Sequence, residues 1–90
     1  MLNASIQDSD ILSAAQKKVL TIICDSNYPI SCSSILDLMG TSKQAAHFSL
    51  TRLLDREFIT RAKDRVFVYQ ANPTRMAELI ERYKNKLQKK

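Results

Sequence analysis

The stretch "SILDLMGTSKQAAHFSLTRLLDREFITR", residues 34–61, decides the fold. Its first part predicts a short helix that stops before Gly40, the only glycine of the chain, because a helix end favours a glycine in the left-handed conformation. Thr41 or Ser42 can cap a following helix that runs to about Arg56. Two helices joined by so tight a glycine turn make a helix-turn-helix.

The second helix of this pair has two different faces. Ala46, Leu50, Leu53 and Leu54 recur at helical spacing and predict one buried stripe. At ~100° per residue, Phe48 lies about 160–200° from that stripe, among polar side chains. A phenylalanine in that position indicates either a misassigned helix phase or a second face that meets a partner.

A further helix is predicted over residues 13–26. Ser13 and Gln16 have the spacing of a capping box, in which each side chain satisfies a free backbone N–H of the first turn. The predicted buried stripe of this helix consists of Ala15, Val19, Ile22 and Ile23. Residues 1–12 precede it as an arm, and the apolar residues that could dock this arm on a neighbour are Leu2, Ile6 and Ile11.

The residues that follow the helix-turn-helix predict a small β-hairpin. Residues 58–59 and 66–69 are β-branched or aromatic and predict two short strands. The polar residues between them place the turn near Lys63 and Asp64. A very short extended segment is also predicted around Ile30, because a proline before it ends the preceding helix.

A last helix is predicted from Pro73 to about Lys90. Asn72 can cap it, and proline is favoured at the first helical position. Four residues near heptad spacing predict a dimerisation surface, with packing on the same domain as the alternative: Met76, Ile80, Tyr83 and Leu87. The helix also carries a basic tail, which either seeks phosphate or is merely solvated: Arg82, Lys84, Lys86, Lys89 and Lys90.

Charge is distributed unevenly along the 90 residues, whose net charge is +5. Residues 1–40 hold two basic and four acidic side chains, a net of −2. Residues 41–90 hold twelve basic and five acidic side chains, a net of +7. This asymmetry predicts that one side of the molecule meets a polyanion, with a simply solvated surface as the alternative.

The composition argues against several classes of protein. No apolar run approaches the ~20 residues of a membrane span, and the first residues do not resemble a signal peptide. No acid pair, nucleophile constellation, metal spacing or phosphate loop appears. Cys24 and Cys32 could be redox sensors, but inert thiols are the simpler interpretation. We therefore expect an intracellular, cytoplasmic protein that is not an enzyme and holds no metal or cofactor.

The order of these elements is helix, short strand, helix, helix, hairpin and helix, and it resembles the winged helix-turn-helix family, which is mainly α with a small β-hairpin. Within it, the chain looks most like the small bacterial regulators of the multiple-antibiotic-resistance (MarR) type and their arsenic-sensor-like (ArsR) relatives. The resemblance covers roughly residues 12–70: "LSAAQKKVLTII" looks like the first core helix of that family, and residues 34–61 resemble its helix-turn-helix running into the wing. The family usually has a small turn residue followed by Leu-Ile, where this chain has Glu57, Phe58 and Ile59.

The resemblance implies that residues 42–56 enter the DNA major groove and that the wing, residues 60–66, meets flanking backbone or minor groove. The major groove admits one helix, where Gln, Arg and apolar side chains can read adenine, guanine and thymine. Backbone N–H groups at a helix start also suit a phosphate. The candidate contacts of the helix, each with solvation as its alternative, are Thr41, Ser42, Lys43, Gln44, Ala45, His47, Phe48, Thr51 and Arg52, and those of the wing are Arg61, Lys63 and Arg65.

The predicted organisation is an N-terminal arm (1–12), a winged helix-turn-helix domain (13–71) and a C-terminal helix (72–90). The predicted function is sequence-specific binding of double-stranded DNA as a small homodimeric transcriptional regulator, most simply a repressor. Two alternatives stay open. One is a DNA-binding factor for replication, partition or transfer of a mobile element, and the other is a winged helix that contacts protein without binding DNA.

Overall fold

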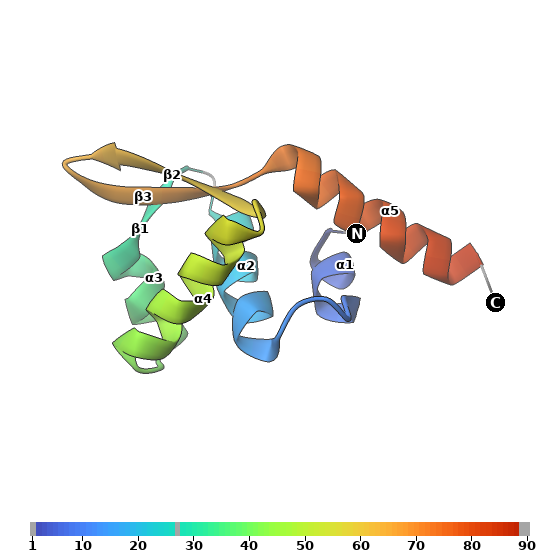
Figure 1. Ribbon diagram of the computed structural model, residues 1–90, viewed down its shortest axis with the longest axis horizontal. Coiled ribbons are helices and arrows are strands. Elements are labelled where there is room, and N and C mark those ends of the chain that lie inside the picture. The colour runs from blue at the N-terminus through green and yellow to red at the C-terminus, as the bar shows by residue number, and fades with distance from the viewer. Residues whose placement is uncertain (1, 27, 89–90) are drawn as a thin grey trace.

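The computed structural model describes residues 2–26 and 28–88. Its elements are α1 (Leu2–Asp8), α2 (Ala14–Asp25), β1 (Ile30–Ser31), α3 (Cys32–Met39), α4 (Lys43–Asp55), β2 (Ile59–Asp64), β3 (Val66–Ala71) and α5 (Pro73–Gln88). Helices α2, α3 and α4 lie together on one side of the sheet, and α5 extends away from them past α1 (Figure 1). The chain is mainly helical with a small antiparallel sheet, as predicted.

Caps and a left-handed glycine set the bounds of the helix-turn-helix, which α3 and α4 form. The Ser31 hydroxyl caps α3 by accepting a hydrogen bond from the Ser34 N–H at 3.2 Å. Gly40 ends α3 with φ 66° and ψ 17°, a conformation that costs glycine little. The Ser42 hydroxyl then caps α4 by accepting from the Ala45 N–H at 3.2 Å. The predicted glycine turn and the predicted cap of α4 at Ser42 are confirmed.

Helix α2 begins as predicted, but its buried face is rotated from the expected one. The Ser13 hydroxyl accepts from the Gln16 N–H at 3.2 Å. The Gln16 side-chain oxygen accepts instead from Arg56 Nη1 at 3.1 Å, so only half of the capping box forms. Ala15 is exposed, whereas Gln16 and Leu20 are buried. The prediction for Ala15 is wrong because α1 and α4 both pack on α2 and cover its other side.

The sheet has the strand order β1-β3-β2, and both strand pairs are antiparallel. Strand β1 is the short extended segment that the sequence predicts. In the hairpin, Asp64 stands opposite Val66, so Arg65 alone forms the tip, with φ 66°. The turn predicted near Lys63 and Asp64 therefore lies one residue later, because a left-handed residue at Arg65 closes the hairpin.

The chain passes from α4 into β2 through Glu57, whose φ is 63°. This is the position where the regulators that the sequence resembles usually have a small residue. Asn72 holds the turn, because its Nδ2 donates to the Glu57 carbonyl at 2.9 Å and its backbone N–H donates to the Phe58 carbonyl at 2.9 Å. The Asn72 Oδ1 also accepts from the Thr74 N–H at 3.1 Å and caps α5, as predicted. One asparagine thus joins the end of α4 to the start of α5.

Residues 2–8 form a helix of the main body instead of an arm. Helix α1 packs against both α2 and α5. Ile6 and Leu12 are buried in the same core as Val19, Leu53 and Leu79, which come from three other helices. Ile6, one of the residues that could dock an arm on a neighbour, lies in the core of its own chain.

Candidate nucleic-acid interface

Helix α4 presents a polar face to solvent on the side opposite to the core. Ala46, Leu50 and Leu53 are buried, whereas Phe48 is 66% exposed. The predicted phase of this helix is therefore confirmed, and Phe48 belongs to a second, open face. All the residues from which we expect DNA contacts in this segment are exposed: Thr41, Ser42, Lys43, Gln44, Ala45, His47, Phe48, Thr51 and Arg52.

The open face of α4 combines groups that suit the edges of base pairs. The Gln44 amide can donate to and accept from adenine, and the Arg52 guanidinium can donate twice to guanine. Ala45 and Phe48 offer apolar surface for a thymine methyl group. Arg52 makes no salt bridge with another described side chain, so its donors are not occupied by a carboxylate among them.

The structure brings His47 next to a cysteine that is distant in the sequence. The Cys32 Sγ lies 3.9 Å from the His47 Nδ1 and so links the first residue of α3 to α4. Burial raises the pKa of the Cys32 thiol above its ordinary value of 9.0. The thiol is therefore protonated at neutral pH, and the pair joins the two helices of the helix-turn-helix.

Cys24 lies where α2 meets α5. Its Sγ is 3.7 Å from the Met76 Sδ. Burial, and to a smaller degree the negative charge of Asp25, raises the pKa of the Cys24 thiol to about 11. A thiol that stays protonated is a poor nucleophile, which agrees with the inert thiol that we expect from the sequence.

Residues 2–26 and 28–88 form neither a metal site nor a membrane-spanning helix. No group of three His, Cys, Asp or Glu side chains in this part of the chain could hold a metal ion. The pair of Cys32 and His47 supplies two ligands, whereas a structural zinc site takes four. In the same residues, no helix combines the length and the apolar character that crossing a membrane requires.

The hairpin of β2 and β3 forms the wing. The three basic residues predicted to contact DNA from it are all exposed: Arg61, Lys63 and Arg65. Lys63 stands opposite Phe67, a residue of β3 that is 44% exposed. The Arg61 Cζ lies 4.4 Å, and the Lys63 Nζ 5.9 Å, from the centroid of the Phe67 ring. The wing therefore carries an aromatic ring close to two cations.

Sequence reasoning missed Phe67 because it placed the hairpin turn one residue too early. A two-residue turn at Lys63 and Asp64 would put Phe67 opposite Thr60. The observed tip at Arg65 puts it opposite Lys63 instead. Arginine is not among the residues that mark a left-handed turn position, so this register has no local signal in the sequence.

Helix α5 has one face on the body of the chain and another in solvent. Met76 and Leu79 are buried, so the structure assigns Met76, one of the four predicted dimer residues, to the core of its own chain. Ile80 and Tyr83 are half-buried, and Leu87 is 50% exposed. These last three residues leave an apolar stripe that the single chain covers incompletely.

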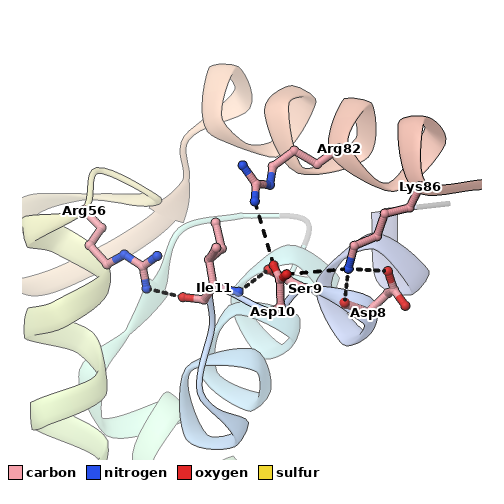
Figure 2. A network of polar contacts seen from close by, with 7 residues as sticks. All are labelled: Asp8, Ser9, Asp10, Ile11, Arg56, Arg82 and Lys86. Atoms are coloured by element: carbon pink, nitrogen blue, oxygen red, sulfur yellow. Dashed lines mark hydrogen bonds and ion pairs between the residues drawn. The ribbon is translucent and has the colours of Figure 1, made fainter. Parts of the chain in front are cut away.

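Two basic side chains of α5 pair with acidic side chains near α1 (Figure 2). The Lys86 Nζ lies 3.4 Å from an Asp8 carboxylate oxygen and 3.9 Å from one of Asp10, and the Arg82 Nη2 lies 3.8 Å from the other Asp10 oxygen. All four side chains are about half exposed or more, so each pair contributes less than about 1 kcal/mol. The other members of the predicted basic tail are Lys84, which is exposed, and Lys89 and Lys90, which lie outside the described residues.

Arg56, at the end of α4, braces the fold. Its Nη1 donates to the Ile11 carbonyl at 2.6 Å and to the Gln16 side chain at 3.1 Å (Figure 2 shows the first of these bonds). Its guanidinium also lies 5.1 Å from the centroid of the Phe58 ring. The two arginines near the end of α4 thus have different environments, because Arg56 bonds to the loop after α1 whereas Arg52 is exposed.

The sequence matches no protein-family model and no curated protein. The fold, however, is similar to that of solved transcriptional regulators. One of them is BpsR of Bordetella bronchiseptica, whose DNA binding is regulated by 6-hydroxynicotinic acid. It matches with a TM-score of 0.70 and 20% identity, over 97% of this chain and 66% of that one. The transcriptional regulator Tm0710 of Thermotoga maritima matches with a TM-score of 0.64 and 25% identity, over 86% of this chain and 58% of that one.

A transcriptional regulator of the MarR family from Silicibacter pomeroyi matches with a TM-score of 0.63 and 14% identity, over 96% of this chain and 66% of that one. The chain thus spans 58% to 66% of the length of these three proteins. The three matches cover 86% to 97% of this chain. The chain therefore has the winged helix-turn-helix fold of the MarR-type transcriptional regulators.

Proposed function

We propose that this protein binds double-stranded DNA in a sequence-specific manner, as a transcriptional regulator without catalytic activity of its own. The observation that carries the proposal is the open face of α4, which is polar and basic, holds an exposed phenylalanine and has the core directly behind it. Support comes from the fold, which similar proteins described as transcriptional regulators share. Among these, BpsR is a protein whose DNA binding is regulated.

Helix α4 has the dimensions of a helix that reads the major groove. Its 13 residues make a rod of ~20 Å, and the groove of B-DNA is about 12 Å wide. In that groove Gln44 and Arg52 contact base edges, and Phe48 packs against a thymine methyl group. The first turn of α4, which begins at Lys43, directs N–H groups and a lysine toward a phosphate.

The wing supplies the second contact. Arg61, Lys63 and Arg65 lie on or between two paired strands, which hold them at defined positions. Basic side chains in such a position neutralise phosphates or enter a flanking minor groove. The wing thus adds affinity beside the site that α4 reads.

We further propose that two copies pair through α5. Ile80, Tyr83 and Leu87 form a stripe that the single chain leaves partly open, and a second copy of α5 would cover it. A two-fold dimer presents two α4 helices to half-sites about one DNA turn apart, so the preferred site is an inverted repeat. Occupancy of such an operator is sufficient for repression, which makes a repressor the simplest role.

Duplexes selected from a random pool by the wild-type protein test the proposal. Arg52→Ala on α4 should weaken binding to the selected duplex about 5- to 150-fold, the range for one lost base contact. Phe48→Ala should weaken it while stability changes by less than about 1 kcal/mol, because the side chain is outside the core. Lys17→Ala is the matched control, since it removes a cation of α2 that donates to the Gln7 carbonyl and lies outside α4, the wing and α5, so affinity should stay within about twofold.

The outcomes also separate the proposal from its alternatives. A wild-type protein that enriches no sequence, with Arg52→Ala and Phe48→Ala binding duplex as the wild type does, would overturn the proposal in favour of a protein-contact role. If selection succeeds, footprinting across the genome separates a regulator from a factor for replication or transfer. Bound sites at promoters support the regulator, and bound sites confined to origins contradict it.

A further inference from the structure

We propose that Phe67 is a positioning residue that holds the Arg61 guanidinium, so that the wing prefers duplexes with a narrow, A·T-rich minor groove beside the site read by α4. This inference rests on the proposed function. It adds a source of sequence preference that neither the basic residues alone nor α4 would provide.

The strand register brings Arg61, Lys63 and Phe67 together in a group that we call the platform. Residues two apart on a strand share a face of the sheet, so Arg61 and Lys63 lie on the same face of β2. Phe67 stands opposite Lys63, and Tyr69 stands opposite Arg61, so both belong to that face as well. Tyr69 is buried, which identifies the face as the one that the helices cover. Beyond the helices, the same face continues to the hairpin tip as Arg61, Lys63 and Phe67.

This geometry places the platform and α4 on one side of the sheet. Helices α2, α3 and α4 all lie on that side (Figure 1). A single duplex in contact with the open face of α4 can therefore also meet the cations of the wing. The tip residue Arg65 extends the basic surface outward.

The contact between Arg61 and Phe67 explains why the guanidinium is held in place. A guanidinium 4.4 Å from a ring centroid is within the range of a cation–π contact. A guanidinium that stacks on a ring through its face keeps its N–H donors, which lie in its plane, free for acceptors. Arg61 makes no salt bridge with another described side chain. The ring of Phe67, a residue that is 44% exposed, thus orients the guanidinium, a role that a carboxylate often has.

A positioned cation and a mobile one differ in what they recognise. A mobile arginine neutralises phosphates of any sequence equally well. An arginine held at one depth and direction discriminates by groove width, because narrow A·T-rich minor grooves have an enhanced negative potential. The Phe67 ring therefore converts a general phosphate contact into a preference for the shape of the flanking DNA.

The test uses two duplexes that share the sequence selected for α4 and differ in the flanks, which are A·T tracts in one and G·C-rich in the other. The wild type should prefer the A·T-flanked duplex about fivefold or more, the effect of one altered base pair. Phe67→Ala and Phe67→Leu should abolish this preference, whereas Phe67→Tyr, which keeps the ring, should retain it. Arg61→Ala should abolish it too.

Tyr28→Ala is the matched control, because Tyr28 is an exposed aromatic residue outside α4 and the wing, and the preference should survive. Phe67→Leu retains an apolar side chain, so its Tm should equal that of the wild type. Loss of the preference for the A·T-flanked duplex at an unchanged Tm would show that the ring positions Arg61 and does not act through folding. Equal weakening of both duplexes by Phe67→Leu, with the preference intact, would overturn the inference. If the wild type binds both duplexes equally, the inference about Phe67 fails and the proposed function stands. If the wild type binds neither duplex, the proposed function fails as well.

Discussion

The turn between α4 and β2 allows backbone strain to be measured directly. Glu57 has φ 63° there, and a left-handed backbone costs a residue with a Cβ about 1–2 kcal/mol. The side chain of Glu57 is exposed and makes no salt bridge with another described residue. Glu57→Gly should therefore relieve strain without the loss of an observed side-chain contact.

The expected gain is smaller than the strain itself, because glycine also gives the unfolded chain more freedom. This second effect costs about 0.4–1 kcal/mol, and the midpoints of the two ranges leave a net stabilisation of about 0.8 kcal/mol. In a domain of this size 1 kcal/mol shifts Tm by about 4–8 °C, so Tm should rise by about 3–6 °C. Affinity for DNA should not change, since glycine retains the carbonyl to which Asn72 donates.

Thermal unfolding followed by circular dichroism measures the effect. Glu81→Gly is the matched control, because Glu81 is an exposed residue inside α5. The same substitution should there cost roughly 0.5–1 kcal/mol, the penalty of glycine in a helix interior. A Tm that falls for Glu57→Gly, as it does for Glu81→Gly, would refute the assignment of strain to Glu57.

Three further predictions follow from the fold. Gly40→Ala should cost about 1 kcal/mol in urea unfolding, because φ is 66° although no atom lies within 4 Å of an added Cβ; an unchanged unfolding free energy would contradict the need for a left-handed residue. Leu87→Glu should lower the dimer fraction in sedimentation. The unfolding free energy should change by less than about 0.5 kcal/mol, because Leu87 is half exposed. A wild type that is monomeric would contradict pairing through α5. Burial raises the pKa of the Cys24 thiol from 9.0 to about 11, so the stability that the protonated thiol contributes is fully present below pH 9 and is lost between pH 9 and 11. The unfolding free energy of Cys24→Ala should therefore fall less steeply over this range than that of the wild type, and parallel pH profiles of the two proteins would contradict the shift.

The helix-turn-helix could be predicted because its signals are local. The glycine turn at Gly40, the serine cap at Ser42 and the start at Asn72 and Pro73 each depend on residues within one turn of a helix. The phase of α4 was predictable for a similar reason, since its apolar residues follow one helical period. The open face that carries the predicted DNA contacts follows directly from that phase.

The features that sequence reasoning missed depend on contacts between distant segments. Gln16 bonds to Arg56, which is 40 positions away, and so leaves the capping box that its local spacing suggests. A helix of seven residues such as α1 is too short to show a period, and Ile6 is buried only because α1 meets α2 and α5. Met76 and Ile80 fall on one predicted stripe, and only the packing of α5 shows that Met76 belongs to the core.

One part of the candidate site could be predicted from local pattern, and the other part could not. The predicted DNA contacts of α4 follow from the helix phase, whereas the platform of the wing follows from the strand register. That register depends on the left-handed conformation of Arg65, for which the sequence has no Gly or Asn signal. The three cations of the wing could therefore be named from the sequence, but the ring beneath two of them could not.

Binding of the wild-type protein to its selected duplex as a function of salt tests the central claim most directly. Five exposed basic residues lie on α4 and the wing: Lys43, Arg52, Arg61, Lys63 and Arg65. Arg52 and Arg61 are proposed to meet base edges and the minor groove, so Lys43, Lys63 and Arg65 of each copy meet phosphates. Each of these six contacts of a dimer adds about −0.9 to the slope of log affinity against log salt, and affinity should fall about 1000-fold between roughly 50 and 200 mM salt. Tight binding that does not change with salt, or no binding of duplex at low salt, would contradict the account.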